Sequence, residues 1–201
     1  MAIVLTGNHI QLELLNDTHR QELYTIAQDE SIWTYSSSKA LGDKFDRWFD
    51  KAVKCLQTGG HLPFAVRRIS DNKLIGSTRY YDIDAENKRL TIGYTWYVPA
   101  VWGSRVNPEC KYLLLQNAFG SLHANRIEFA ADLRNARSCA AIRKIGAKEE
   151  GILRHHMILE DGHIRDTVIF SITKPEWSSI KLNLESRLKE FNSGMSNKIT
   201  T

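Results

Sequence analysis

The stretch AVWGSRVNPECKYLLLQ, residues 100–116, changes from an irregular turn into an apolar run with helical spacing. Asn107 is a residue type that caps helices, and Pro108 suits the first helical position because its missing N–H needs no intrahelical partner. The amides of the loop at residues 103–106 and of the first helical turn can then converge on one anion at the positive end of the helix dipole. The local sequence leaves two interpretations open, a capped turn alone or an anion-binding loop.

Two runs typical of strands flank this stretch, RLTIGYTWYV at residues 89–98 and RIEFAADL at residues 126–133. Strand, helix and strand therefore follow one another, which predicts two parallel strands joined by a right-handed crossover. Ligands favour the carboxyl ends of the strands in such a unit. The loop at residues 103–106 lies at one of these ends.

The rest of the chain predicts further helices on a mostly antiparallel sheet. The other expected helices cover residues 18–28 with Asp17 as cap, 44–57, 136–146 and about 175–191. The other expected strands cover residues 9–15, 63–69, 74–83, 151–159 and 165–172, with short links typical of hairpins. This order predicts a mixed α+β fold, with a single domain over residues 1–191 and a flexible polar tail at 192–201.

Composition excludes several classes of protein. A chain of 201 residues with 42% hydrophobic content can bury one sizeable core. Its formal net charge of +4 comes without a basic cluster, so nucleic-acid binding is not predicted. The three cysteines, Cys55, Cys110 and Cys139, have neither disulfide-framework nor zinc spacing. No leader or membrane-length apolar segment is visible, so we expect a cytoplasmic protein without a membrane partner.

Several motifs together resemble the GCN5-related N-acetyltransferase superfamily, in particular its branch of ribosomal-protein alanine acetyltransferases. The motifs are the strand TIGYTWYV, the loop PAVWGSRVN and the segment NARSCAAIRKIGAKEEGILR, extended by DGHIRDTVIFSI. The resemblance covers nearly the whole chain. It implies a mixed, mostly antiparallel sheet whose central parallel strand pair splays apart, with the pantetheine arm of acetyl-CoA in the gap.

The resemblance also implies roles for particular residues. The residues expected to bind acetyl-CoA are Trp96, Tyr97 and Val98 on the strand, Gly103, Ser104, Arg105, Val106 and Asn107 in the pyrophosphate loop, and Asn135 and Ser138. Ser138 is the expected catalytic residue, since its hydroxyl would protonate the leaving thiolate. For Asn135 and Ser138 a helix-capping role is the structural alternative. A backbone N–H near Tyr97 or Val98 would stabilise the oxyanion.

The chain departs from the family pattern at five positions. Trp102, Arg105 and Asn107 stand where the usual loop has Gln or Arg, Gly, and Gly or Ala. Arg105 must therefore adopt a strained backbone or reshape the loop, and we expect its guanidinium to bind a CoA phosphate. Thr91 and Ile142 stand where many relatives have a Glu and a Tyr. The usual base and one usual acid are thus missing.

Other candidate residues divide into two groups. Asp82, Asp84 or Glu128 could accept the amine proton through water, and the sequence does not choose among them. An acceptor cleft could be lined by Trp33, Tyr35, Trp48, Phe49, Tyr80 and Tyr81, although such aromatic residues also build cores. His155 and His156 point to opposite faces of a regular strand, and no metal site is predicted. Cys139 is expected to be a core residue rather than a nucleophile.

These observations predict an acetyl-CoA-dependent N-acetyltransferase that transfers acetyl directly to a primary amine in a ternary complex. The acceptor is a protein N-terminal α-amine or a small amine; an α-amine with a pKa near 8 is roughly 10% neutral at pH 7 and needs less help than lysine. The alternative is a catalytically weak CoA-binding or interaction protein with a degenerate site. Nucleic-acid binding is the third hypothesis, and a homodimer is left open.

Overall fold

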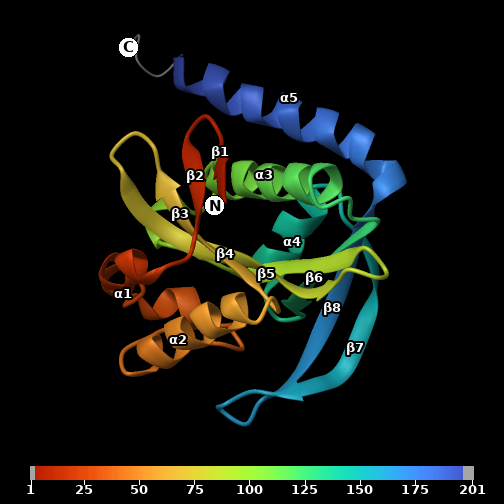
Figure 1. Ribbon diagram of the computed structural model, residues 1–201. Coiled ribbons are helices and arrows are strands. Elements are labelled where there is room, and N and C mark those ends of the chain that lie inside the picture. Colours follow the sequence, from red (N-terminus) through yellow and green to blue (C-terminus); the bar gives the residue numbers. More distant parts are fainter. Residues whose placement is uncertain (1–2, 197–201) are drawn as a thin grey trace.

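The computed structural model describes residues 3–196, which form eight strands and five α-helices (Figure 1). The strands are β1 (Val4–Thr6), β2 (Ile10–Leu14), β3 (Leu62–Arg68), β4 (Lys73–Asp84), β5 (Arg89–Tyr97), β6 (Arg126–Asp132), β7 (Lys148–Ile158) and β8 (Ile164–Thr173). The helices are α1 (Arg20–Ile26), α2 (Lys44–Gln57), α3 (Val106–Gly120), α4 (Ala136–Lys144) and α5 (Trp177–Ser196). No helix of the described chain is long and apolar enough to cross a membrane.

All eight strands belong to one sheet with the order β1-β2-β3-β4-β5-β6-β8-β7. Every neighbouring pair is antiparallel except β5 and β6, which are parallel and joined through α3. The mixed, mostly antiparallel sheet and its parallel β-α-β unit are therefore confirmed. β1, at one edge of the sheet, was not predicted.

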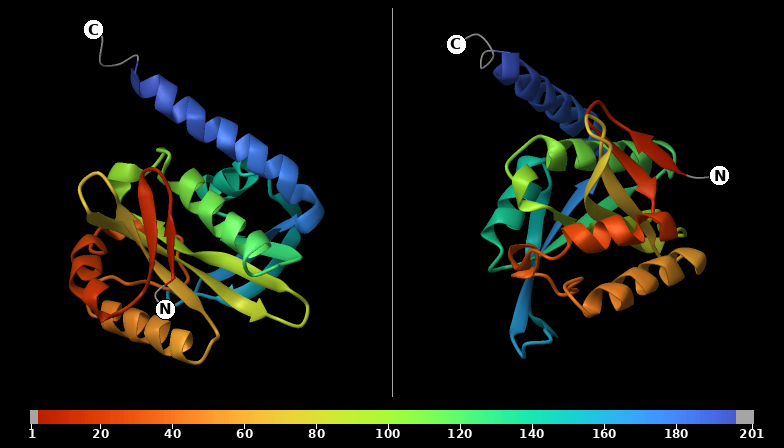
Figure 2. Two further views of the ribbon diagram at one scale, coloured as in Figure 1. Left: turned by 45° about the horizontal axis from the view of Figure 1, so that its top comes forward. Right: turned by 90° about the vertical axis from the view of Figure 1, so that its left-hand side faces the viewer.

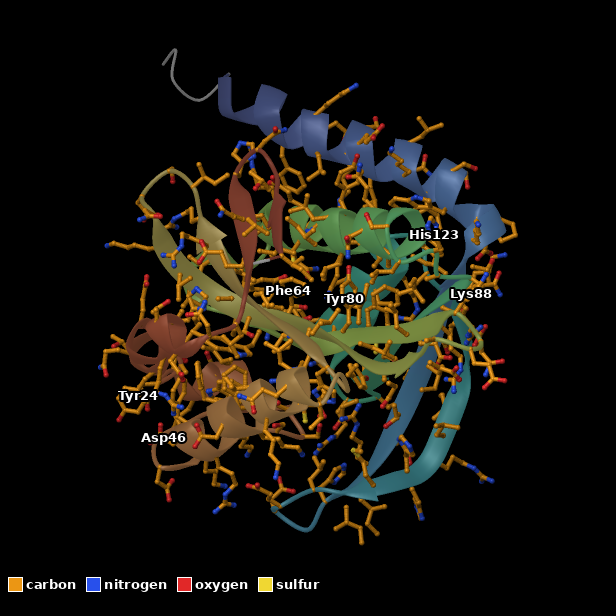
Figure 3. The ribbon with its side chains drawn as sticks, viewed as in Figure 1. Tyr24, Asp46, Phe64, Tyr80, Lys88 and His123 are labelled. Carbon is orange, nitrogen blue, oxygen red and sulfur yellow. The ribbon has the colours of Figure 1, made fainter. Side chains whose placement is uncertain are left out.

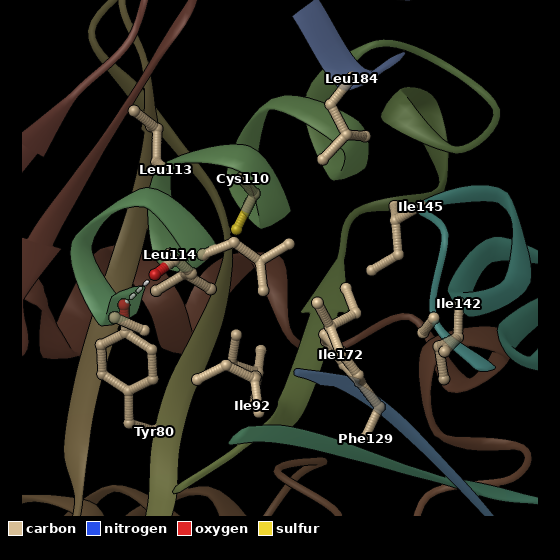
Figure 4. Close-up of a cluster of buried hydrophobic side chains, with 14 of the residues drawn as sticks. Tyr80, Ile92, Cys110, Leu113, Leu114, Phe129, Ile142, Ile145, Ile172 and Leu184 are labelled. Carbon is tan, nitrogen blue, oxygen red and sulfur yellow. Dashed lines mark hydrogen bonds between the residues drawn. The ribbon is translucent and has the colours of Figure 1, made fainter. Parts of the chain in front are cut away.

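Helices cover both faces of this sheet (Figure 2). One hydrophobic cluster lies between the sheet and α3, α4 and α5, and includes Leu114, Ile142 and Ile180 (Figure 4). The second cluster joins the other face to α1 and α2 and includes Leu23 and Phe49. The two clusters explain the helical spacing of the apolar residues, because each helix turns one face toward the sheet.

Adjacent tyrosines on β4 show how strand geometry assigns side chains to the two faces. Tyr80 is fully buried on the side of α3, next to Phe64 (Figure 3). Its ring packs edge-on to Phe64 at 5.8 Å, and its hydroxyl donates to the Leu114 carbonyl at 2.6 Å. Tyr81 takes the opposite face because successive strand residues alternate. Only this second tyrosine can reach the site described below.

The parallel strands β5 and β6 separate after a short ladder. Their paired residues end at Thr91 and Glu128, although both strands continue beyond this point. On its other edge β5 carries a bulge, because Tyr94 and Thr95 both lie opposite Thr78 between two regular pairs of β4. Tyr94 has a φ of 48°, in the left-handed region. Ladder end and bulge together open a gap between the two central strands, as the resemblance implied.

Some element boundaries differ from the expected ones. Asn16, rather than Asp17, caps the first helical segment, since its side chain accepts from the Thr18 N–H at 2.9 Å. A short 3₁₀ segment, Asp17–His19, precedes α1. The terminal helix α5 continues to Ser196 instead of ending near residue 191. The rest of the expected tail, residues 197–201, lies outside the described residues.

Candidate active site

A cavity of about 690 Å³ lies where β5 and β6 separate. It begins at the N-terminal end of α3 and α4, passes along β5, and continues under α2 and the loop before it. We call the part beside α3 and α4 the donor half and the part beside α2, β4 and β8 the acceptor half. Both halves line one continuous space, so two reactants can meet in it.

Six of the predicted binding residues line the donor half of the cavity. They are Trp96, Tyr97, Gly103, Asn107, Asn135 and Ser138. The remaining four, Val98, Ser104, Arg105 and Val106, are not among the residues that line it. The backbone explains part of this division, because Gly103, at φ 72°, is the residue that turns the loop toward the helix.

Helix α3 begins earlier than predicted. Its first residue is Val106, so Asn107 lies inside the first turn and is not the cap. The Ser104 hydroxyl accepts instead from the Val106 N–H at 3.3 Å. Asn107 accepts from the Tyr97 hydroxyl at 3.4 Å, while its own N–H has no intrahelical acceptor. The start of α3 thus still offers an N–H to an anion in the cavity, although Pro108 removes the next one.

Arg105 does not face the cavity. Its φ is −65°, so the expected backbone strain is absent, and Gly103 takes the left-handed conformation in its place. Its guanidinium contacts the His9 ring at 2.6 Å and donates to the Phe191 carbonyl at 2.5 Å. These contacts tie α3 to the β1–β2 turn and to α5. The expectation that Arg105 binds a CoA phosphate therefore has no geometric support, because the side chain points to the opposite side of α3's first turn.

Hydrogen bonding separates the two candidate oxyanion donors. The Val98 N–H donates to the Ile75 carbonyl of β4 at 2.9 Å, so it is already used. Pairs alternate in an antiparallel ladder, and Tyr97, opposite Gly76, therefore turns its N–H and carbonyl away from β4. The Trp102 indole donates to that Tyr97 carbonyl at 2.9 Å. Of the two candidates, Tyr97 is the one whose N–H is directed into the gap.

Asn135 and Ser138 lie together at the start of α4. The Asn135 side chain caps this helix by accepting from the Ser138 N–H at 2.9 Å. The structural alternative thus describes Asn135, which also lines the cavity. The cap uses the backbone of Ser138 and not its hydroxyl. Ser138 is half-buried at the cavity wall, and its Oγ makes no hydrogen bond to the described residues.

Two cations of the donor half were missed by the sequence interpretation. Lys111 on α3 is only 5% exposed, and its Nζ donates to Thr95 Oγ1 of the β5 bulge at 2.8 Å. No carboxylate of the described chain forms an ion pair with it, and burial lowers its pKa to about 8. Arg137 on α4 stacks its guanidinium 3.6 Å above the Trp102 ring, and both residues line the cavity.

The acceptor half contains most of the predicted aromatic side chains. Trp33, Tyr35, Trp48 and Tyr81 line it, but Phe49 and Tyr80 do not. Phe49 is fully buried under the guanidinium of Arg20, 4.3 Å from the ring centroid. Aromatic spacing could not separate these cases, because core and cavity residues lie on the same helix and strand.

The three candidate carboxylates also separate. Asp82 and Glu128 line the cavity, whereas Asp84 lies at the β4–β5 turn. There Asp84 accepts two hydrogen bonds from Asn87, which lower its pKa, and pairs with Arg89 at 3.2 Å. Asp84 is thus a turn residue and not a candidate base. Glu128 accepts from Arg126 Nε at 3.0 Å, while no described cation forms an ion pair with Asp82.

Cysteine and histidine side chains add no metal centre. The described residues contain no group of three or more His, Cys, Asp or Glu that could hold a metal ion. Strand β7 is irregular at His155, whose φ is 50°, and His156 reaches the cavity with Nδ1 3.0 Å from Thr167 Oγ1. Cys139 is buried, and burial raises the pKa of its thiol. This environment disfavours the thiolate that a nucleophile requires.

The splayed parallel pair, the β5 bulge and the loop before α3 define an acetyltransferase-type site. A family model described as an acetyltransferase (GNAT) domain matches residues 9–148. The chain therefore belongs to the acetyltransferase (GNAT) domain family.

Relatives and solved structures agree with this assignment. The chain is 31% identical over 111 residues to a Bacillus subtilis (strain 168) protein named "Putative ribosomal N-acetyltransferase YdaF", over 55% of this chain and 60% of that one. The match thus spans about three fifths of that relative's length. A GCN5-related N-acetyltransferase structure from Brucella melitensis superposes with a TM-score of 0.85 at 29% identity, over 92% of this chain and 85% of that one. An acetyltransferase structure from T. thermophilus gives a TM-score of 0.81 at 32% identity, over 92% and 96%.

Proposed function

We propose that the protein is an N-acetyltransferase that takes acetyl from acetyl-CoA and transfers it directly to a primary amine held in the same cavity. The observation that carries the proposal is the continuity of the donor and acceptor halves along β5. It supports a ternary complex, because both substrates fit beside one strand without a covalent enzyme intermediate. The acceptor classes are a protein N-terminal α-amine and a small amine.

The donor half fits the chemical parts of CoA. The phosphates would lie near the first turn of α3, where the Asn107 N–H has no intrahelical acceptor, and near the guanidinium of Arg137. The pantetheine, which carries amides, would run along the unpaired edge of β5 beside Trp96 and Tyr97. Acetyl-CoA would supply an acetyl group already activated as a thioester.

The protein's own groups would then stabilise charge and move protons. The Tyr97 N–H, aimed into the gap, can donate to an acyl oxygen as negative charge develops on it. The Ser138 hydroxyl can give its proton to the leaving sulfur. Asp82 and Glu128 are the cavity carboxylates that can accept the amine proton through water. The acceptor must react as a neutral amine, so the rate should rise with pH until the amine pKa is passed.

The direct test of this function measures release of free thiol from acetyl-CoA with a panel of amines. We expect release that depends on the acceptor and saturates in both substrates, with intersecting rather than parallel lines in double-reciprocal plots. Parallel lines would indicate an acetyl-enzyme. Tight CoA binding without turnover on any peptide or small amine would support the alternative of a CoA-binding protein with a degenerate site.

Arg137 and Arg105 give a matched pair for testing the donor half. We expect Arg137→Ala to weaken CoA binding about tenfold, since it removes a charge-assisted contact at an exposed position. Arg105→Ala should leave CoA affinity within about twofold but lower the free energy of unfolding by about 1–2 kcal/mol, because two hydrogen bonds are lost.

Titration calorimetry with CoA and dephospho-CoA checks both variants. A loss confined to CoA places Arg137 at the 3′-phosphate, and equal losses place it at the pyrophosphate. Equal weakening of CoA binding by the two variants would contradict the orientation of Arg105 described above.

A further inference from the structure

Two arginines beside the acceptor half are buried without an acidic partner. Arg165 of β8 is 8% exposed and lines the cavity, and its Nε makes no hydrogen bond to the described residues. Arg79 of β4 is 2% exposed, and both its Nε and Nη2 lack partners. Neither side chain forms an ion pair within the described chain. Buried cations are ordinarily paired, so a buried guanidinium without a carboxylate requires an explanation.

These two guanidinium groups lie along one row of rings. Arg79 stacks 4.2 Å from the centroid of the Tyr94 ring, and that ring packs edge-on to Tyr81 at 5.0 Å. Tyr81 interacts electrostatically with Arg165 at the other end of the row. Burial lowers the pKa of Arg79 to about 10, so the group still carries its charge at pH 7. The row therefore gives this wall of the cavity a positive potential.

Asp132 does not neutralise Arg165. Its carboxylate accepts from the backbone N–H of Arg134 at 2.9 Å, from Nε at 3.1 Å and from Nη2 at 2.9 Å. No N···O distance between Asp132 and Arg165 falls within ion-pair range. The carboxylate is thus committed to Arg134, and it offsets the charge of Arg165 only from a distance.

The charges of the whole cavity lead to the same result. Glu128 is paired with Arg126 and Asp132 with Arg134, which leaves Asp82 as the lining carboxylate without an ion pair among the described residues. Lys111, Arg137 and Arg165 are lining cations without one. Lys111 and Arg137 belong to the donor half. Arg165 is therefore the excess charge of the acceptor half, with Arg79 behind the cavity wall.

From this arrangement we infer that the acceptor amine carries a carboxylate, which Arg165 binds. The inference rests on the proposed function and narrows its substrate class. Carboxylate oxygens match the forked donors of a guanidinium, and a partly desolvated contact of this kind is strong. The carboxylate can be that of a free amino acid or an acidic side chain near a protein N-terminus. A polyamine would bring further positive charge to Arg165 and is disfavoured.

Pairs of acceptors that differ only in charge test this inference. One pair is alanine and alaninamide, and the other is a peptide beginning Ala-Glu and its Ala-Gln counterpart, with spermidine as a cationic probe. We expect kcat/KM to be higher for the acidic member of at least one pair, and that pair identifies the source of the carboxylate. Arg165→Gln should lower kcat/KM for the acidic member about 10- to 100-fold and change the neutral member less than threefold.

Control variants separate the charge of Arg165 from a general effect. Arg165→Lys keeps the charge and should restore part of the preference. Arg154→Gln, at an exposed position of the neighbouring strand β7, should change neither member of a pair. The melting temperature of Arg165→Gln should stay unchanged or rise, because a buried cation without a partner is removed.

A binding measurement distinguishes failure of this inference from failure of the proposed function. Acidic and neutral acceptors are titrated into protein saturated with CoA, which cannot turn over. Binding that needs both the carboxylate and Arg165, without turnover in the presence of acetyl-CoA, supports the carboxylate site and overturns the acetyltransferase proposal. Turnover with no preference for acidic acceptors, or equal losses for both members in Arg165→Gln, overturns the carboxylate site alone.

Discussion

Replacing Lys111 by methionine is expected to raise the free energy of unfolding at pH 7 by up to about 3 kcal/mol. The reason is the shift of its pKa from 10.5 to about 8 by burial, at about 1.36 kcal/mol per pKa unit. The only hydrogen bond lost is the one to Thr95, whose hydroxyl keeps its contact with Thr78 Oγ1 at 2.8 Å. Methionine has a similar length and fills the same space between α3 and the sheet.

The pH dependence of stability gives this prediction its sign. The folded-state pKa is depressed, so between pH 8 and 10.5 the unfolded chain binds more protons than the folded one. The Lys111 contribution to stability therefore improves as pH rises through this window, and it is lost as pH falls toward 8. The advantage of Lys111→Met should accordingly be largest at pH 7 and small above pH 10.5.

Urea unfolding of both proteins at pH 7 and pH 10 measures this difference. Lys54→Met, at an exposed position of α2, serves as control and should change stability by less than about 0.5 kcal/mol. A less stable Lys111→Met at pH 7 would show that the ammonium group is compensated in the folded state. We also expect this variant to have a lower kcat/KM for acetyl-CoA, because it removes a cation from the proposed donor half.

Ser138→Ala is expected to lower the single-turnover rate of acetyl transfer about 100-fold, the lower range for assistance by a general acid. The substitution removes Oγ but keeps the Ser138 N–H that donates to Asn135, so the cap of α4 remains. The free energy of unfolding and the CoA dissociation constant should change little. Rapid-quench measurement at saturating acetyl-CoA avoids the case in which product release limits kcat.

A conservative variant makes this experiment specific. Ser138→Thr retains a hydroxyl at the same place and should recover most of the rate. Asn135→Ala, in contrast, removes the cap and should lower the free energy of unfolding by about 1 kcal/mol. An unchanged single-turnover rate in Ser138→Ala would exclude its hydroxyl from proton transfer to the leaving sulfur.

Local sequence predicted most elements because their signals lie within a few residues of each other. The apolar spacing of α2 gave its bounds, Lys44–Gln57, and the β-branched and aromatic runs gave β4, β5 and β6 to within one residue. The three-residue strand β1 has too few residues to show a period. Cap positions at Asn16 and at the start of α3 were displaced, since neighbouring residues of similar capping propensity compete there.

Candidate residues on the strand and on α4 were placed well because the resemblance ties them to regular elements. Arg105 was misplaced because the direction of a long side chain depends on its partners, here His9 and Phe191, which are remote in sequence. Lys111 had a local signal that was not used. It shares the apolar face of α3 with Leu115 and Ala118 at helical spacing, so its burial could have been predicted.

The sequence by itself determined the order of the elements, the parallel β-α-β unit and the residues at its carboxyl end, because periodicity and turn chemistry are local properties. Only the tertiary structure decided which charges remain without partners. Arg126 and Arg134 pair with the cavity carboxylates, while Arg79, Lys111 and Arg165 are buried without one among the described residues. Ion pairing depends on distances of a few ångströms between residues far apart in the chain, and those distances exist only once the sheet and its helices have packed.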